Sequence, residues 1–564
     1  MMIKKIGLFF LCFPLVMFVV ETLFFIIGWH VNCSAFIFAF IFVVWYLLKN
    51  EDRNTCIKSL FWFVSLIFIT IFIGTNVYDA SYDGQWYHSS IIKLLYDGWN
   101  PFYYPILQQI EIPYYTNTHI WVSHYAKGME TIEAGIVALT GNLESGKALN
   151  VFFTISLFCF TFDFLGNFKG INRGAVKTLI AFTTTLNPVL INQIMTYYID
   201  YTCYVFVLIG LICVYNIVIK QQKSYMSPLG LIGFFIPATK FNIAFWFVVI
   251  LLAFMGFLYY AKRIFNKKLF WTMTVIVIIG FIIGAFNPYI TNTIIKHNPV
   301  YPLAGKDKID IMSIVTPKNI KGKCRFYQVN YSLAVNPYSS DSRRMGNDSF
   351  FKITKDDLMD SPKHDAQLGG FGEFFFEAML ILLIVFILLK KDKNWRLVAG
   401  FILFLYLCLF LLPTGFLVRY VPFFYFVPCV LISYILYATN EKYKKGFALV
   451  AMGLLLLDSL FSLAGVVAIN IQQRVQTDYI VQQIKAKKST VYVYSQSVQL
   501  HNKLNNAGCK YQNGNILKDK KNKNQIDLIG VKMQTNLTPE DFNSSEMPLL
   551  MQKIAMFQLK FSKL

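Results

Sequence analysis

Long apolar runs recur along most of this chain of 564 residues and constrain its fold more than any other feature. A helix needs about 20 apolar residues to cross the roughly 30 Å hydrocarbon core of a bilayer, and within lipid it satisfies its own backbone hydrogen bonds. Hydrophobic residues make up 56% of the chain and charged residues only 15%. The sequence therefore predicts an all-α polytopic membrane protein. About thirteen crossings are expected, near residues 6–28, 34–48, 58–76, 149–166, 178–196, 200–220, 229–239, 242–260, 270–288, 374–390, 396–412, 421–438 and 446–468.

Lysines and arginines gather in short loops between the apolar runs, as they do in the cytoplasmic loops of membrane proteins. The net charge of +21 therefore reports topology, and no nucleic-acid partner is expected. Residues 229–239 would reach only about 17 Å as a helix, but counting them as a short or broken crossing keeps the basic loop 261–269 in the cytoplasm. The predicted cytoplasmic loops hold Lys49, Arg53, Lys58, Lys169, Arg173, Lys177, Lys220, Lys223, Lys262, Arg263, Lys267, Lys268, Lys390, Lys391, Lys393, Arg396, Lys442, Lys444 and Lys445, whereas the short loops on the other side hold almost none, only Lys240 and Arg419.

This orientation puts three long segments outside the cytoplasm: the loop 77–148, the loop 289–373 and the tail 470–564. Residues 1–468 are the expected transmembrane domain. In the first loop, SSIIKLLYDG and METIEAGIVAL have apolar residues at helical spacing, which predicts amphipathic helices in the membrane interface. The tail has two strand-like runs, STVYVYSQ and IDLIGVKM, with the lysine-rich turn KDKKNKNQ before the second. These patterns predict a small C-terminal domain of mixed α/β structure.

The polar and aromatic stretch from Val77 to Pro105 follows the third apolar run directly and contains Asp79, Asp83 and His88. Charge near hydrocarbon costs free energy, so an acid at the mouth of a membrane span is a functional candidate. The alternative is a solvated loop in which the aspartates only form turns.

Further charged residues lie at the outer ends of predicted spans. Asp200 precedes the sixth span, Lys240 lies between the seventh and the eighth, and Arg419 and Tyr420 begin the twelfth. We expect these side chains to line one outward-facing cavity together with the acids of the first loop. Taken singly, Lys240 and Arg419 could instead be anchors whose stems lie along apolar surface while their charged ends reach water.

Six strings, in order along residues 79–422, resemble motifs of the bacterial GT-C glycosyltransferases, integral enzymes that take a sugar from a polyprenyl phosphate. YDGQWYH (Tyr82–His88) resembles an Asp-x3-Tyr-His motif, and HYAKGMETIEA (His124–Ala134) resembles a Tyr-Pro-x-Gly-x-Glu stretch in which alanine replaces the proline. NPVLINQIMTYYIDY (Asn187–Tyr201) is similar to a Pro-x3-Gln segment that ends in an aspartate. The other three are ATKFN, similar to a Lys-Tyr/Phe-x-Gly/Asn turn; HNPVYPL, similar to an Asn-Pro-Val-Tyr-Pro element; and LVRYVPF, similar to an Arg-Tyr-x2-Pro motif.

The resemblance implies a GT-C fold and a family 39-like enzyme of the bacterial inner membrane whose active site faces the periplasm or exterior. It indicates the superfamily and not a particular substrate. The chain departs from the family in the number of spans ahead of the loop 77–148, where these enzymes more usually have one. The tail beyond residue 470 lies outside the resemblance.

The residues also fit the chemistry of sugar transfer from a polyprenyl-phosphate donor. Such an enzyme needs a base for the acceptor hydroxyl, cations for the departing lipid phosphate, and a site that aligns both substrates. We expect Asp83 to be the base, with inversion at the anomeric carbon, and Asp79 to be its alternative. Lys240 and Arg419 are the expected phosphate ligands. The expected substrate-binding residues that orient groups, bind sugar hydroxyls or stack on sugar faces are His88, Tyr87, Glu130, Asp200 and Tyr420. A divalent metal bridging carboxylate and phosphate would fit this chemistry, although no residue pattern requires one.

Two other functions stay open. A polymerase or ligase of lipid-linked glycans shares the lipid phosphate and the outer face, and Arg343 and Arg344 in the second loop suit it. A lipid or sugar transporter would place ionisable residues near the bilayer midplane, where only Glu21 and Asp458 lie; each is more typical of an interhelical hydrogen bond. The sequence leaves open the sugar and whether the acceptor is a glycan, a lipid or a protein.

Overall fold

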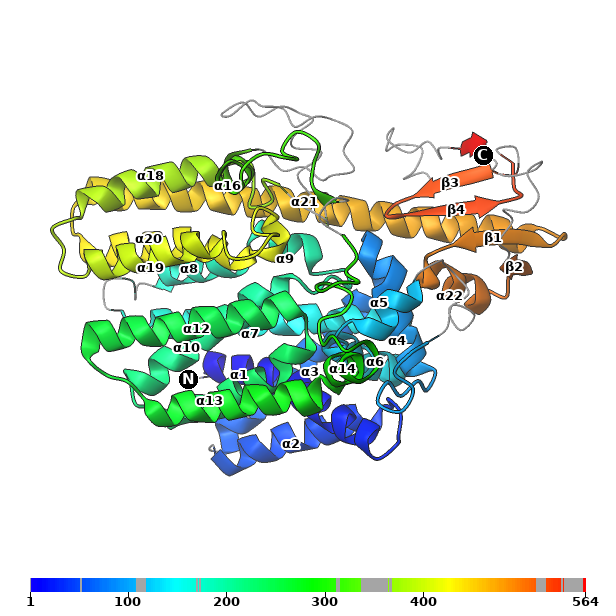
Figure 1. Ribbon diagram of the computed structural model, residues 1–564, viewed down its shortest axis with the longest axis horizontal. Helices are drawn as coiled ribbons and strands as arrows, with labels where there is room; N and C mark the ends of the chain where they lie inside the picture. The colour runs from blue at the N-terminus through cyan, green and yellow to red at the C-terminus, as the bar shows by residue number, and fades with distance from the viewer. Residues whose placement is uncertain are drawn as a thin grey trace.

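The computed structural model describes residues 2–50, 53–107, 118–168, 171, 174–310, 315–335, 364, 368–513, 524–538, 541 and 561–563. Over these residues the chain is mostly helical and carries a small C-terminal sheet (Figure 1). Each expected apolar segment contains a helix. These helices are α1 (Met2–Ile26), α2 (Ser34–Asn50), α3 (Arg53–Asn76), α7 (Ala148–Leu165), α8 (Gly174–Thr185), α10 (Tyr201–Val218), α11 (Met226–Phe235), α12 (Phe241–Lys262), α13 (Lys267–Ile279), α18 (Phe375–Leu388), α19 (Trp395–Cys408), α20 (Phe426–Ala438) and α21 (Lys442–Ala486).

Several of these helices are long and apolar enough to cross a membrane, which agrees with the predicted class of protein. In the described part of the chain, seven helical segments meet both criteria and four apolar helices are shorter. The seven are Met2–Ile26, Ile57–Asn76, Leu143–Leu165, Tyr201–Val218, Phe241–Lys262, Lys267–Gly284 and Lys442–Ala486. The count of thirteen crossings stays a prediction.

Helix α10 forms the centre of the bundle. Nearly all of its residues are buried, and it packs against α7, α11 and α12. A helix that is apolar on every side has no surface suited to water, so it belongs in a core. The short seventh segment is indeed a broken helix: α11 continues as the 3₁₀ turn Ile236–Ala238, and the backbone is extended at Lys240 before α12 begins.

The first long loop contains α4 (Ser89–Tyr96), α5 (Thr118–His124) and α6 (Gly128–Thr140). Helix α4 ends just before Gly98, whose φ of +106° is readily adopted only by glycine. Helix α6 differs from the expected interfacial helix because every residue from Gly128 to Val137 is buried. This part of α6 packs between α1, α4 and the turn Leu143–Lys147, so protein covers it on all sides.

Helix α21 links the bundle to the C-terminal sheet (Figure 1). It has 45 residues, and at 1.5 Å per residue it is about 68 Å long, more than twice the roughly 30 Å of a bilayer core. The domain boundary expected near residue 470 falls inside this helix. Its last turns contribute Tyr479, Ile480 and Ile484 to the core under the sheet.

The C-terminal sheet has strand order β2-β1-β4-β3-β5. Strand β1 pairs in parallel with β2, and the other pairings are antiparallel. The expected strand in STVYVYSQ is β1, but IDLIGVKM forms parts of two strands, since Gly530 (φ +77°) turns the chain between β3 and β4. Most of the lysine-rich turn lies outside the described residues. The strands are β1 (Val491–Ser495), β2 (Tyr511–Asn513), β3 (Asn524–Leu528), β4 (Val531–Thr535) and β5 (Phe561–Lys563), and α22 (Val498–Asn506) lies between β1 and β2 in the chain.

The remaining described helices include α9 (Pro188–Gln193), α14 (Thr291–Lys296) and α16 (Arg325–Ala334). The last two belong to the second long loop. Arg343 and Arg344, on which the polymerase alternative depends, lie outside the described residues. Asp458 of α21 accepts a hydrogen bond of 2.9 Å from the backbone N–H of Phe374 at the start of α18, as expected of an interhelical hydrogen-bonding residue.

Candidate functional site

Four charged side chains from distant parts of the sequence meet in one cluster. Lys240 Nζ lies 2.7 Å from Asp200 Oδ1, and Arg419 Nε lies 4.0 Å from the other oxygen of Asp200. Arg419 Nη1 also lies 3.5 Å from Asp83 Oδ2. The cluster thus runs Asp83, Arg419, Asp200, Lys240, with the signs of charge alternating.

Helix ends bring these four residues together. Asp83 lies in the first helical turn after residues 78–81, which belong to no helix or strand, and Asp200 immediately precedes α10, where the helix N-terminus favours a negative charge. Lys240 occupies the break before α12, and Arg419 lies on the 3₁₀ turn Val418–Tyr420. The predicted convergence of these residues is therefore found in the structure.

Two tyrosines complete the cationic side of the cluster. Arg419 Nη2 donates a hydrogen bond of 2.9 Å to Tyr420 Oη, and its guanidinium lies 5.2 Å from the ring centre of Tyr198. Lys240 Nζ lies 4.6 Å from the ring centre of Tyr420. Aromatic faces attract cations electrostatically, so these rings hold both positive charges in place.

Lys240 keeps its charge despite its burial. Burial lowers the pKa of a lysine, but here the neighbouring Asp200 and Tyr420 outweigh that effect and raise the pKa of Lys240. Asp200 is only 2% exposed, whereas the Asp83 side chain is 21% exposed. The two carboxylates therefore differ in access: Asp200 holds the cations from within the protein, and Asp83 can be reached from outside.

A second pair of site residues lies beside the cluster. His88 Nδ1 and Glu130 Oε1 are 2.6 Å apart, and both side chains are buried. The ring of Tyr87 lies 4.2 Å from that of His88 and 5.8 Å from that of Tyr125. Burial, followed by the charge of Asp83, raises the pKa of the Tyr87 hydroxyl well above its ordinary value, so Tyr87 acts as a neutral hydrogen-bonding group.

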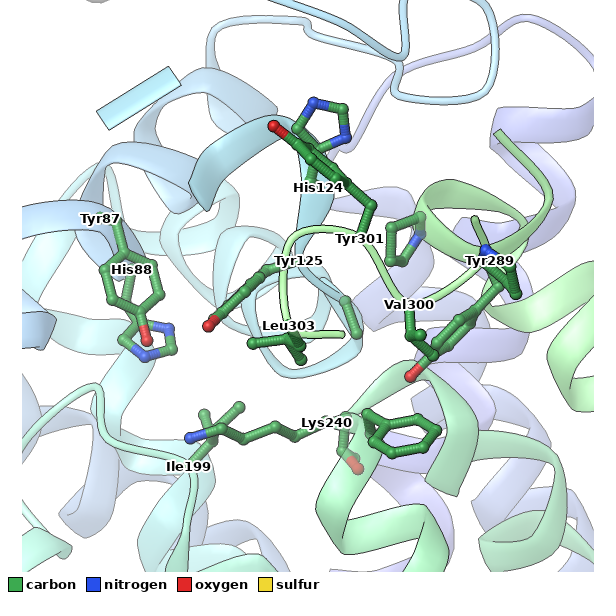
Figure 2. Close-up of a pocket in the computed structure, with 15 residues that line it drawn as sticks. Tyr87, His88, His124, Tyr125, Ile199, Lys240, Tyr289, Val300, Tyr301 and Leu303 are labelled. Carbon is green, nitrogen blue, oxygen red and sulfur yellow. The ribbon is translucent and has the colours of Figure 1, made fainter. Parts of the chain in front are cut away.

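The charged cluster, through Lys240, and the His88–Glu130 pair, through His88, both reach one narrow pocket. Its lining includes Tyr87, His88, Tyr125, Lys240 and Tyr301, and Figure 2 shows the Lys240 amino group on the same side as the hydroxyls of Tyr87 and Tyr125. The cavity volume is about 20 Å³, room for about one water molecule. Tyr301 comes from the string HNPVYPL, so this string also reaches the pocket.

Asp79 is the one predicted site residue that the structure keeps apart. Its Oδ1 accepts hydrogen bonds from Ser81 N (2.8 Å) and Ser81 Oγ (2.7 Å), and its Oδ2 accepts one from Tyr197 N (2.9 Å). Burial raises the pKa of Asp79, while the charge of Lys147 and the bonds from Ser81 oppose that rise. A buried carboxylate committed to three donors cannot approach an acceptor hydroxyl, so the predicted catalytic alternative is not supported.

Two residues without a predicted role support the pocket wall. Lys127 Nζ donates to Ser123 O (3.2 Å), Tyr125 O (2.6 Å) and Asn287 Oδ1 (2.5 Å), and burial lowers its pKa to about 7. His124 Nδ1 lies 2.7 Å from Asn292 Oδ1. Both residues belong to the string HYAKGME, and its resemblance to a family motif was the sequence feature that could have pointed to them. They fasten the turn that carries Tyr125 to the segment after α13.

A metal site is not evident in the described part of the chain: no three His, Cys, Asp or Glu side chains converge there in a way that could hold an ion. No family model, no curated protein and no solved structure matches the chain. The chemistry of the site is therefore argued from its geometry.

Proposed function

We propose that this chain is a membrane glycosyltransferase that moves a sugar from a polyprenyl-phosphate donor to an acceptor outside the cytoplasm, with inversion. The observation that carries this proposal is the cluster of Asp83, Arg419, Asp200 and Lys240. It combines one accessible carboxylate with two held cations at the ends of apolar helices, where a lipid phosphate would lie.

In this mechanism Asp83 removes the proton from the acceptor hydroxyl as the oxygen attacks the anomeric carbon. The bond from that carbon to the phosphate oxygen breaks, its electron pair stays with the phosphate, and the proton remains on Asp83. Attack from the face opposite the phosphate inverts the anomeric centre. General-base assistance of this kind contributes about 10²–10⁴ in rate.

Lys240 and Arg419 would act on the leaving group. A sugar phosphodiester carries about one negative charge and the released lipid phosphate about two, so cations stabilise the transition state more than the bound donor. The ion pairs of Arg419 with Asp83 and Asp200, at 3.5 and 4.0 Å, are longer than hydrogen bonds. A phosphate could therefore approach the guanidinium without displacing a tight carboxylate pair. The narrow pocket beside Lys240 would have to widen for the donor.

His88, Glu130 and Tyr87 would hold the sugar. The His88–Glu130 pair fixes the imidazole, and Tyr87 and Tyr125 offer neutral hydroxyls on the same pocket. Neutral donors and acceptors suit sugar hydroxyls, while aromatic rings suit the apolar faces of sugar rings.

The proposal includes an orientation: about thirteen crossings in a bacterial inner membrane, with the cluster and the tail outside. Cysteines introduced at Asn513 and at Arg263 test it. We expect an impermeant maleimide added to intact cells to label residue 513 and to reach residue 263 only after permeabilisation. Labelling of residue 263 in intact cells would remove the shared outer face and with it the proposed site.

Transfer from a polyprenyl-phosphate sugar by the purified chain in liposomes tests the function directly. We expect transfer to require Asp83 and to survive Asp97→Asn, a matched control in the same loop whose side chain is exposed and paired with Lys93. Movement of intact donor across the bilayer without bond cleavage would favour a transporter. Chain extension of a lipid-linked glycan, independent of Asp83, would favour a polymerase or ligase.

A further inference from the structure

A second cavity lies between the C-terminal sheet and the loop that carries Asp83. Its volume is about 440 Å³, within the range of small-molecule sites. Tyr82, the neighbour of Asp83 in sequence, lines one side and is 42% exposed. The sheet supplies most of the rest of the lining, chiefly through Tyr494, Gln525 and Gln534. This cavity is far larger than the narrow pocket beside Lys240.

The pairing of the strands places polar side chains on the face of the sheet that lines the cavity. Gln534 of β4 pairs with both Tyr494 of β1 and Gln525 of β3, so these three form one row across the sheet. Asp527 and Lys532 face each other in a second row. The alternate residues of the same strands point to the other face and form the core with α21 and α22.

Two features indicate that these side chains are set to bind a ligand. Gln534 Oε1 is buried and has no hydrogen-bond partner among the described residues, and a buried acceptor left unsatisfied costs free energy. Gln525 Nε2 donates a hydrogen bond of 2.8 Å to Asp527 Oδ1, which fixes the two side chains relative to each other.

The sheet is fastened to the loop that carries Asp83. Gln85 Nε2 donates to Ile529 O (2.8 Å) at the tip of the β3–β4 hairpin, and Gln85 Oε1 accepts from Ser497 Oγ (3.1 Å). A Cβ at Gly530 would lie 2.6 Å from Ala80 O, so the hairpin tip packs directly on the loop. The cavity therefore keeps a fixed position next to the turn of Asp83.

We propose that this cavity binds the glycan part of the acceptor and presents its hydroxyl to Asp83. Amide and carboxylate groups bond to sugar hydroxyls, and tyrosine rings stack on sugar faces. The lining holds one acid and one base, Asp527 and Lys532, so its charge favours a neutral glycan over an anionic ligand. The inference rests on the proposed function for the identity of the ligand as an acceptor.

Binding of the full-length chain in detergent to an array of neutral oligosaccharides tests this site, without any need for turnover. We expect binding by the wild type and a loss of about tenfold in affinity, or about 1.4 kcal/mol, in Asp527→Ala and in Gln534→Leu. Asp527 is exposed, so its variant should fold normally. Tyr492→Ala is the matched control, because Tyr492 lies on the same face of β1 outside the cavity.

Absence of binding to every neutral glycan, or equal binding by the wild type and both variants, would overturn the inference. Sugar transfer from the polyprenyl-phosphate donor is measured separately with Asp83→Asn. If glycan binding depends on Asp527 but sugar transfer is unchanged in Asp83→Asn, the proposed catalytic role of Asp83 is wrong and the glycan site still stands.

Discussion

The two aspartates of the first loop should separate stability from turnover. Asp83 is partly exposed, and its ion pair with Arg419 is long at 3.5 Å. Asp79 is buried and accepts three hydrogen bonds, two from Ser81 and one from Tyr197 N. Changing each to asparagine keeps its size and removes its charge. We expect Asp83→Asn to lose turnover with little loss of stability, and Asp79→Asn to do the reverse.

The magnitudes follow from these contacts. For Asp83→Asn, the buried Arg419 keeps Asp200 as a counter-charge and its hydrogen bond to Tyr420, so loss of the long pair should cost only about 1 kcal/mol. Loss of a general base costs about two to four orders of magnitude in turnover. In Asp79→Asn the oxygen can still serve Ser81, but the new amide then faces the Tyr197 N–H, a donor against a donor. One hydrogen bond to a charged group is lost and a buried N–H is left unsatisfied, at a cost of about 2–3 kcal/mol.

Both quantities can be measured on the full chain. Turnover is followed with a polyprenyl-phosphate sugar in liposomes, and stability by thermal unfolding in detergent, with Asp97→Asn as the control for both. Turnover of Asp83→Asn within about threefold of the wild type would refute its role as the base. Loss of turnover in Asp79→Asn at unchanged stability would show that the roles of the two aspartates are exchanged.

Three further predictions concern other parts of the site. Lys240→Met should weaken binding of the polyprenyl-phosphate donor by about tenfold or more, since it leaves the phosphate and Asp200 short of a charge partner; unchanged donor affinity in a direct binding assay would make Lys240 an anchor. His124 has a pKa lowered to about 4 by burial, so the unfolded chain binds its proton first and stability should fall as pH drops from about 6.5 to 4, by at most about 1.4 kcal/mol per pH unit. Melting curves at several pH values should show this loss reduced in His124→Gln but not in the exposed control His297→Gln. Lys503 of α22 pairs with the buried Glu144, so Lys503→Met should speed hydrogen exchange in α22 and β1, and unchanged exchange would show that this pair does not hold the tail.

The sequence predicted the part of the site that depends on how deep each residue lies in the membrane. Asp200, Lys240 and Arg419 each lie at the same end of an apolar run, and helices of similar length bring such ends to one level. The functional difference between Asp79 and Asp83 could not be predicted this way. Asp79 is held by a backbone N–H that lies 118 residues away in the chain, and no local pattern reports such a contact.

The remaining misses have similar causes. Lys127 received no predicted role because its three acceptors are two backbone carbonyl groups and the side chain of Asn287, which is 160 residues away. The burial of α6 was missed because amphipathic spacing resembles that of an interfacial helix, whether the other face meets lipid or protein. The continuation of α21 beyond the predicted crossing 446–468 was not predicted because hydropathy falls near residue 470, although Tyr479, Ile480 and Ile484 continue a helical apolar stripe.

Because α21 is one continuous helix, its length sets the distance between the bundle and the C-terminal sheet. Each residue added to a helix moves whatever follows by about 1.5 Å and turns it by about 100°. One inserted residue near Asn470 would therefore swing the hairpin tip away from Gln85, while four would nearly restore its facing and lift it by about 6 Å. The number of residues in α21 therefore sets both the distance between the sheet and the bundle and the direction in which the sheet faces.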